Sequence, residues 1–486
     1  MGAAHDSVDA VVVGAGPNGL AAAVTLARAG LAVEVYERAS TVGGGARTAQ
    51  TTLPGYLHDL GSAVHPMALA SPFFREFGIE SRVEFVVPDV SYAHVLGSDS
   101  VGVAWRSLDE TVDGLGRDGR AWRSLLGPLS ANPDALLATI GDTLVRVPAH
   151  PVTLARFGLR ALEHGSPAWN LRFREPPARA MLAGLAAHAS GRMPHPVRAG
   201  AGLMLGALAH ARGWPIPIGG SQSISDALAA ELLAHGGSIH LDSEVRDVRE
   251  LPAARALLLD VSAPIAARIA GARLSPGSRR RLERVRFGNA SFRLDLATNS
   301  PIPWRDERLT RAGTVHLGGT QAQIAASERA TSGARGTLPP HPFVLLSQPS
   351  LFDPTRAPSG MHTVWAYTHV PGGSSVDASE QIIATIEAAA PGFRDTIVAR
   401  HSRTAQQLEL ENPSLVGGDI TGGVNDLRQT IARPSLFDPW RVGDGVYLAS
   451  SSATPGPGVN GLAGWRAALA ALRREFGLPG PALGPE

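Results

Sequence analysis

The stretch Ala10-Val-Val-Val-Gly-Ala-Gly-Pro-Asn-Gly19 decides the fold of this chain. Its continuous apolar run predicts a strand buried on both faces of a parallel sheet, and the run leads directly into a G-x-G-x-x-G turn. Apolar residues then recur at helical spacing up to Gly30, which we expect to end the helix in the left-handed conformation. A second strand follows, with Glu37 at its end. The pattern predicts the βαβ opening of an α/β, Rossmann-like dinucleotide-binding domain.

Each residue type in this opening has a physical task. Gly14 permits the tight turn, Gly16 lets the backbone approach a diphosphate, and Gly19 lets helix and strand pack closely. The amino terminus of the helix offers free N–H groups and a partial positive charge to phosphate. Glu37 can accept hydrogen bonds from ribose hydroxyls and would repel a 2′-phosphate, which disfavours NADP.

Composition excludes several classes of function. The 486 residues include 44 Lys+Arg and 43 Asp+Glu, and a balance this even argues against nucleic acid as a partner. The sequence has no cysteine, which excludes disulfides, thiolate metal sites and dithiol redox chemistry. It also has no lysine, which excludes a Schiff base and a P-loop lysine. No spacing of His, Asp and Glu indicates a metal site.

Targeting signals are not evident in the sequence. The first ten residues, MGAAHDSVDA, lack the positively charged region that opens a secretory signal. No apolar run approaches the ~20 residues that a membrane-spanning helix needs. We therefore expect a cytoplasmic protein without a transmembrane segment.

A second glycine-rich block follows the acidic residue without a break: Glu37-Arg-Ala-Ser-Thr-Val-Gly-Gly-Gly-Ala-Arg-Thr48. Here the chain resembles the FAD-binding opening of the flavin-dependent amine oxidase and phytoene desaturase superfamily. Gly43, Gly44 and Arg47 match the superfamily's second signature, a glycine pair followed by an arginine. The glycines allow a second close backbone approach, and the guanidinium can pair with a diphosphate oxygen. The alternative is that Arg47 is an ordinary surface arginine.

Two later segments resemble the same superfamily. After a helix that stops near Gly236, a strand leads to Val245, the position where the superfamily places a valine backbone against adenine. Near the carboxyl terminus, a strand ending at Ser450 runs into a glycine-rich turn and a helix. We expect the N–H groups near 459–461 to face the pyrimidine edge of the flavin. This part, with Arg433-Pro434, most resembles the subgroup containing pyridine nucleotide-disulfide oxidoreductase domain-containing protein 2 and bacterial phytoene dehydrogenase-like proteins.

The resemblance implies FAD as the cofactor and a discontinuous domain to hold it. The implied cofactor-binding residues are Gly14, Gly16, Pro17, Asn18, Gly19, Glu37, Arg38, Gly43, Gly44, Gly45, Arg47, Val245, Ser450, Pro457, Gly458, Val459, Asn460 and Gly461. We predict an FAD-binding domain from residues 1–75, 213–262 and 407–476, an inserted mixed α+β substrate domain with a helical lid from 76–212 and 263–406, and a flexible tail over 477–486.

The two inserted segments differ in pattern. Between about residues 72 and 212 the sequence predicts mostly helix, with apolar stripes near 136–144 and 154–159. One interpretation is a lid or membrane-surface patch that gives a lipophilic substrate access. The other, which we favour, is a helical subdomain whose stripe faces the core. In the second segment, alternation predicts a mixed sheet with strands at 291–296, 314–317, 343–346 and 363–367.

The motifs favour removal of hydride from a hydrophobic small molecule, with the flavin reoxidised by oxygen, a quinone or another acceptor. Amine oxidases of the superfamily typically use a lysine beside the flavin and an aromatic cage, so a desaturase type is favoured over an amine oxidase. Two alternatives stay open: a structural FAD and a redox-neutral FAD in isomerisation or partner binding. His65, His188 and His210 are candidate acid/base residues. A homodimer is one candidate for the oligomeric state.

Overall fold

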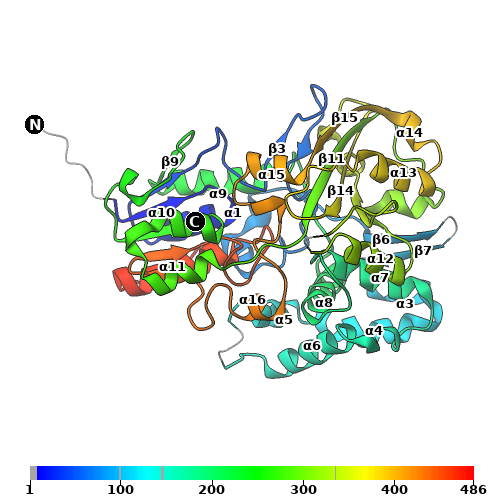
Figure 1. The fold of residues 1–486 in the computed structure, drawn as a ribbon, viewed down its shortest axis with the longest axis horizontal. Helices are drawn as coiled ribbons and strands as arrows, with labels where there is room; N and C mark the ends of the chain where they lie inside the picture. Colours follow the sequence, from blue (N-terminus) through cyan, green and yellow to red (C-terminus); the bar gives the residue numbers. More distant parts are fainter. Residues whose placement is uncertain (1–7, 98–99, 144–146, 334, 486) are drawn as a thin grey trace, which may run out of the picture.

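The computed structural model describes residues 8–97, 100–143, 147–333 and 335–485. Figure 1 shows a lobe around a parallel sheet at the left, a lobe around a larger mixed sheet at the right, and a layer of helices below the second lobe. The chain crosses between the lobes repeatedly, because both sheets take strands from segments far apart in the sequence.

The first sheet has the predicted Rossmann-like form. Its described strands, in spatial order, are β16 (Arg441–Gly443), β17 (Val446–Leu448), β10 (Ala256–Leu259), β1 (Ala10–Val13), β2 (Val33–Tyr36) and β9 (Ser238–His240). All neighbouring pairs are parallel except β16 with β17. The sequence analysis did not predict the central strand β10, whose Ala-Leu-Leu-Leu run has no β-branched residue to distinguish it from helix.

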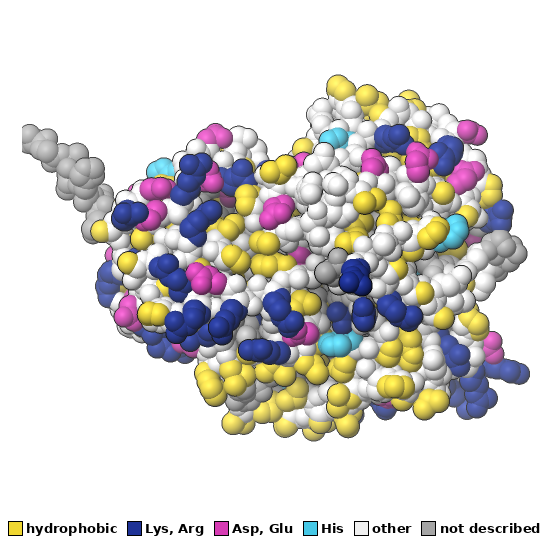
Figure 2. Space-filling view, in the orientation of Figure 1, with side chains coloured by type: hydrophobic (Ala, Val, Ile, Leu, Met, Phe, Trp, Pro, Cys, Tyr) yellow, Lys and Arg dark blue, Asp and Glu magenta, His cyan; other side chains and the backbone are white. Residues whose placement is uncertain are grey.

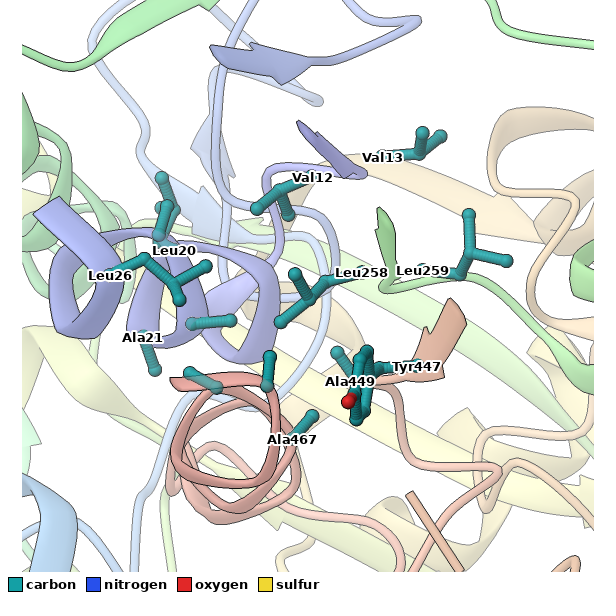
Figure 3. Packing of buried hydrophobic residues seen from close by; sticks show 14 of the residues in the cluster. Val12, Val13, Leu20, Ala21, Leu26, Leu258, Leu259, Tyr447, Ala449 and Ala467 are labelled. Carbon is teal, nitrogen blue, oxygen red and sulfur yellow. The ribbon is translucent and has the colours of Figure 1, made fainter. Parts of the chain in front are cut away.

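Helices cover this sheet, and two of them approach unusually closely. They are α1 (Pro17–Arg28), α2 (Pro72–Phe77), α9 (Gln222–Ala234), α10 (Ala263–Ala270), α11 (Pro276–Glu283) and α17 (Leu462–Ala471). Figure 3 shows small side chains of α1 and α17, Ala21 and Ala467 among them, beside the strand residues Leu258 and Tyr447. A Cβ on Gly464 would lie 1.7 Å from the Asn18 carbonyl oxygen. The two helices therefore pack through backbone, and α1 ends as predicted before Gly30, whose φ is +83°.

The second sheet carries the four expected strands and three that were not expected. Its described strands, in spatial order, are β15 (Ile397–Arg403), β11 (Ala290–Thr298), β14 (His362–Val370), β13 (Val344–Ser347), β12 (Ala312–Leu317), β6 (Val90–Gly97) and β7 (Ser100–Trp105). The unexpected strands are β15, β6 and β7. The antiparallel pair β6 and β7 comes from the segment predicted to be mostly helical. It joins the sheet through a parallel pairing of β6 with β12. Two short two-stranded sheets add β3 (Thr48–Ala49) with β4 (His58–Asp59), and β5 (Phe85–Val86) with β8 (Ile216–Pro217).

The remaining helices enclose this second sheet. The lower layer in Figure 1 contains α3 (Leu108–Gly114), α4 (Gly119–Ser130), α5 (Pro133–Ile140), α6 (Pro151–His164), α7 (Pro176–Ala187) and α8 (Pro196–Ala211). The others are α12 (Gln321–Ala330), α13 (Ser379–Ala389), α14 (Phe393–Thr396), α15 (Ala405–Glu411) and α16 (Leu427–Ile431). No helix among the described residues is long and apolar enough to cross a membrane.

The apolar stripes of the lower layer are divided between core, cavity and solvent. Leu136 and Leu137 on α5 are buried. Leu154 and Phe157 on α6 line a cavity, whereas Leu159 is 66% exposed. Residue 144 of the predicted stripe lies outside the described residues. Leu137 and Ile140 of α5 also line the cavity, so the favoured expectation of a wholly core-facing stripe is wrong for α6 and holds only in part for α5.

The carboxyl-terminal residues form a packed segment, which corrects the prediction of a flexible tail. Leu483 is fully buried, and the Arg28 guanidinium on α1 donates to the Gly484 carbonyl at 2.8 Å. Pro485 lies against Gly78. The Pro- and Gly-rich segment follows the surface of the first lobe. The other predicted domain boundaries stay predictions.

Candidate functional site

A continuous cavity of about 870 Å³ connects the two lobes. At one end its wall includes Gly14, Glu37 and Val245, which belong to the first sheet and its loops. At the other end the wall includes Phe157 and Tyr367, from the helical layer and the second sheet. A volume of this size suits a large ligand or two ligands placed end to end.

Glycine backbone shapes the first end of this cavity. Gly14 has a φ of +98°, and a Cβ there would lie 2.6 Å from the Asp260 carbonyl oxygen. The second glycine-rich block meets the first directly, since a Cβ on Gly44 would lie 3.0 Å from the Cα of Gly16. The two loops thus form a cradle that side chains would fill. Such a cradle at the amino end of α1 suits a diphosphate.

Glu37 is held rigidly on the wall of this cradle. Its Oε2 accepts from the Ala15 amide at 2.8 Å, and its Oε1 accepts from the Ala39 amide at 2.8 Å. These bonds orient the carboxylate and leave lone pairs for ribose hydroxyls. Arg47 lies nearby and donates from Nε to the Gly44 carbonyl at 2.9 Å. Burial lowers the pKa of this guanidinium, an effect that Glu37 partly offsets.

Most of the residues that the resemblance implied for the cofactor line the cavity: Gly14, Gly16, Pro17, Asn18, Glu37, Arg38, Gly44, Gly45, Arg47, Val245, Ser450, Pro457, Gly458 and Val459. Four others, Gly19, Gly43, Asn460 and Gly461, lie behind the wall and have structural tasks. A Cβ on Gly19 would lie 2.0 Å from the Gly14 carbonyl oxygen. The Asn460 side chain accepts from the Leu462 amide at 2.9 Å and so caps α17.

Asp260, which the sequence analysis missed, lies at the centre of the cradle. It is the first residue after β10, and its Oδ2 accepts from the Gly19 amide at 2.8 Å. Burial raises the pKa of Asp260 to about 7, the Gly19 amide opposes this, and the Glu37 carboxylate adds to it. Recognising β10 would have placed this carboxylate beside the glycine turn, because parallel strands end at the same edge of a sheet.

The three candidate histidines have different positions. His65 lines the cavity, and its Nε2 donates to the Ser221 hydroxyl at 2.7 Å, since that hydroxyl donates to the Ser62 carbonyl. Burial lowers the pKa of His65 to about 4. His210 does not line the cavity: its Nε2 accepts from the Trp122 indole at 3.0 Å. His210 therefore has a structural role in the helical layer.

His188 lines the cavity and is paired with a second histidine behind it. Its Nε2 lies 2.9 Å from Nε2 of the buried His316, so one ring donates and the other accepts. Burial lowers the pKa of His188 to about 3, and burial also lowers the pKa of His316 well below its ordinary value. Both imidazoles are therefore neutral at ordinary pH.

The second end of the cavity has a mainly apolar wall with a few polar groups. Trp365 and Tyr367 alternate along β14 and both face the cavity, with ring centroids 5.2 Å apart at 72°. Arg293 on β11 joins them and is paired with Asp295 at 2.8 Å. The sequence analysis predicted these strands but not which face lines the site. Period-two alternation places Trp365 and Tyr367 on the same face of β14, but it does not tell which face of the strand lines a site.

The described residues fit a dinucleotide and offer no alternative metal centre. The glycine cradle, the fixed Glu37 carboxylate and Arg47 could hold the diphosphate and ribose of such a molecule. No group of three or more His, Asp or Glu within the described ranges could hold a metal ion.

Comparisons with known proteins agree with this geometry. Residues 12–77 match a family model for the NAD(P)-binding Rossmann-like domain. Pyridine nucleotide-disulfide oxidoreductase domain-containing protein 2 of Rattus norvegicus is 26% identical, over 96% of this chain and 93% of its own length. A limonene dehydrogenase polypeptide of Castellaniella defragrans is 33% identical over 111 residues, 22% of this chain and 20% of that protein.

A solved structure shows the same fold over nearly the whole chain. A triple mutant of putrescine oxidase superimposes with a TM-score of 0.63 at 19% identity, covering 96% of this chain and 99% of that one. Together with the matching sequences, this confirms the predicted fold class and the resemblance drawn from the motifs. The chain is thus similar over nearly its whole length to pyridine nucleotide-disulfide oxidoreductase domain-containing protein 2, matches a Rossmann-like dinucleotide-binding domain over residues 12–77, and shares its overall fold with putrescine oxidase.

Proposed function

We propose that the chain is an FAD-dependent oxidoreductase that removes hydride from a hydrophobic small molecule, in a desaturation or dehydrogenation. The observation that supports this most directly is the continuous cavity, with a dinucleotide cradle at one end and a largely apolar wall at the other. A cofactor in the cradle and a substrate against the apolar wall would meet inside one continuous cavity.

The chain's own residues supply orientation and electrostatics. Glu37 would hold the ribose, and the amino end of α1 with Arg47 would hold the diphosphate. The turn at 457–459 lines the cavity where α17 begins, and it would face the flavin ring. FAD, when bound, supplies the hydride acceptor. The apolar wall positions a C–H bond and excludes water from it.

Desaturation is favoured over amine oxidation by two observations. The sequence has no lysine to place beside a flavin. The Trp365 and Tyr367 rings meet edge to face at 72°, which does not form two parallel walls around an amine. The local likeness to the limonene dehydrogenase polypeptide, whose name states a hydrocarbon substrate, also favours desaturation.

His188 is the proposed proton acceptor for this reaction. Loss of a hydride from one carbon leaves a proton on its neighbour, and forming the double bond requires that proton to leave. His188 lines the cavity, and the ring nitrogen that does not meet His316 could accept the proton. Burial, which lowers the pKa of this ring to about 3, opposes its protonation. His316, bonded behind it at 2.9 Å, fixes the orientation of the ring. His65 has its Nε2 engaged with Ser221 and is the second candidate.

Exposed apolar side chains on α6 provide an entry for a lipophilic substrate. Val152 is 68% exposed and Leu162 is 59% exposed, while Leu154, Phe157 and Leu162 line the cavity. Figure 2 shows hydrophobic side chains gathered along the lower edge of the molecule, where Figure 1 places α5 and α6. We propose peripheral contact of this edge with a membrane, and a cytoplasmic location for the protein. The electron acceptor and a homodimeric state stay predictions.

The decisive test is spectroscopic. Purified protein incubated with FAD and desalted should keep a flavin absorption band near ~450 nm. Anaerobic mixing with a panel of apolar alkenes, carotenes and amines should bleach this band for hydrocarbons and not for amines. Retained but unbleached flavin across the whole panel would favour a structural or redox-neutral FAD. A colourless protein after incubation would contradict the proposal.

A further inference from the structure

Arg433 is a buried cation on the cavity wall, held by neutral groups. The residue is 4% exposed and lines the cavity beside Ser450, Ser451 and Thr454. No ion pair within 4.0 Å joins Arg433 to an acidic group among the described residues. Arg293, which lines the same cavity, differs in having Asp295 at 2.8 Å.

Carbonyl groups fix the Arg433 guanidinium in place. One terminal nitrogen donates to the Thr421 carbonyl at 3.0 Å and to the Ser451 carbonyl at 3.2 Å. The other donates to the Gly423 carbonyl at 2.8 Å and reaches the Asn425 Oδ1 at 3.4 Å. These contacts fix the position of the cation, but carbonyl dipoles do not remove its net charge.

The nearest carboxylates are engaged elsewhere. Asp419 accepts from the Gly288 amide at 2.7 Å and from the Thr421 amide at 2.6 Å. Asp426 pairs with Arg286. Burial lowers the pKa of Arg433, with Asp419 and Asp426 opposing that effect, and a guanidinium nevertheless stays protonated in proteins.

A buried charge without a direct ion-pair partner is costly, and a site that brings an anion to it offsets this cost. Arg433 contacts the glycine-rich turn that precedes α17. Its carbonyl accepts from the Thr454 amide at 3.2 Å, and a Cβ on Gly456 would lie 3.3 Å from one of its terminal nitrogens. Pro455, Pro457 and the two following residues of the same turn line the cavity. The proposed function places this turn against the flavin ring.

We propose that Arg433 is the fixed positive charge that stabilises the negative charge arriving on the flavin ring with the hydride, and that it thereby sets the reduction potential of the bound FAD. The inference rests on the proposed function, because it requires FAD in this cavity. Because the chain has no lysine, a permanent positive side-chain charge beside the flavin has to come from an arginine such as Arg433. Arg433 would then act only through its charge, and it would not donate or accept a proton.

The test needs no substrate. Sulfite adds as an anion to the ring of oxidised flavins, so its affinity reports positive charge near the ring. With FAD bound, Arg433→Gln should weaken the binding of sulfite to the flavin about tenfold or more. A tenfold change corresponds to a fall of about 30 mV in the two-electron reduction potential of the flavin. Arg433→Lys keeps the charge but loses most of the same hydrogen bonds, and should weaken sulfite by less than about threefold.

A second pair of variants guards against disruption of the turn by changes at Arg433. Asn425→Asp places a carboxylate oxygen at the atom that lies 3.4 Å from the guanidinium. It should lower the sulfite affinity and the potential by amounts similar to those expected for Arg433→Gln. Asn425→Ala removes the same contact without adding charge. It should change the sulfite affinity by less than about twofold and leave the potential almost unchanged.

Equal effects in the charge-changing and charge-neutral variants, or no effect in any of them, would overturn the inference. A wild-type chain that fails to take up FAD would instead overturn the proposed function, so the two failures are distinguishable.

Discussion

The two ends of the cavity are built in different ways. At the dinucleotide end, consecutive residues of a few loops form the wall, and backbone groups of glycines make the closest approaches. At the substrate end, single side chains come from α5, α6, α8 and four strands of the second sheet. A diphosphate and ribose have a constant shape that backbone can match, whereas a substrate is selected by side chains that vary. The difference teaches which substitutions should act on cofactor binding and which on substrate binding.

The largest effect should come from a methyl group in the cradle. In Gly14→Ala, the side chain would meet the Asp260 carbonyl oxygen at 2.6 Å on a backbone with φ of +98°. Strain of about 2 kcal/mol should weaken FAD binding about 30-fold, measured by flavin absorbance titration. Gly114→Ala, where a Cβ meets nothing within 4 Å, serves as the matched control. Unchanged affinity in Gly14→Ala would show that the cradle is not the cofactor site.

The opposite end should respond to charge on its exposed apolar edge. The double variant Val152→Glu with Leu159→Glu replaces side chains that are 68% and 66% exposed. Loss of two membrane-facing apolar groups should reduce binding to phosphatidylcholine–phosphatidylglycerol vesicles about 20-fold, measured by co-sedimentation. FAD affinity should be unaffected, since neither residue lines the cavity. Equal vesicle binding by variant and wild type would exclude α6 as the contact.

A smaller loss is expected when the ribose anchor is neutralised. Glu37→Gln keeps the shape of the side chain but replaces one of two carboxylate oxygens that accept backbone amides at 2.8 Å. Charged hydrogen bonds of this kind contribute about 1.5 kcal/mol, so FAD should bind about tenfold more weakly by isothermal titration. Glu34→Gln, on the strand β2 that ends just before Glu37, is the control. An equal loss in both variants would indicate a general effect of charge.

The smallest effect is a pH dependence of the stability of the protein without FAD. Burial raises the pKa of Asp260 to about 7, so the native state without FAD holds this proton while the unfolded chain has released it. Stability contributed by the proton is present below pH 4 and is lost as pH rises from about 4 to 7. At pH 8 the Asp260→Asn variant should therefore melt about 2–4 °C above wild type. At pH 4 the variant and the wild type should melt at the same temperature. A constant difference across this range would contradict the raised pKa.

The sequence predicted the dinucleotide end of the cavity better than the substrate end. The βαβ opening, the second glycine block and the turn before α17 are contiguous motifs, and most of their residues line the cavity. Asp260 was missed because β10, a run of Ala and Leu, carries no strand-specific signal. Trp365, Tyr367 and Arg293 were missed because alternation marks a strand without saying which face meets a ligand. His210 was proposed as an acid/base residue, yet it lies outside the cavity wall and its ring bonds to Trp122.

The sequence by itself determined the dinucleotide-binding end, because short-range order dictates it: a glycine needed at a positive φ or a close approach is visible in the chain. It also determined the chemical exclusions, since a chain without cysteine or lysine cannot supply thiolate or amine chemistry. Only the tertiary structure decided that Arg433 is buried among carbonyl groups, that His188 is backed by His316, and that α6 faces both cavity and solvent. These properties depend on segments far apart in the sequence, and no local pattern encodes which of them meet.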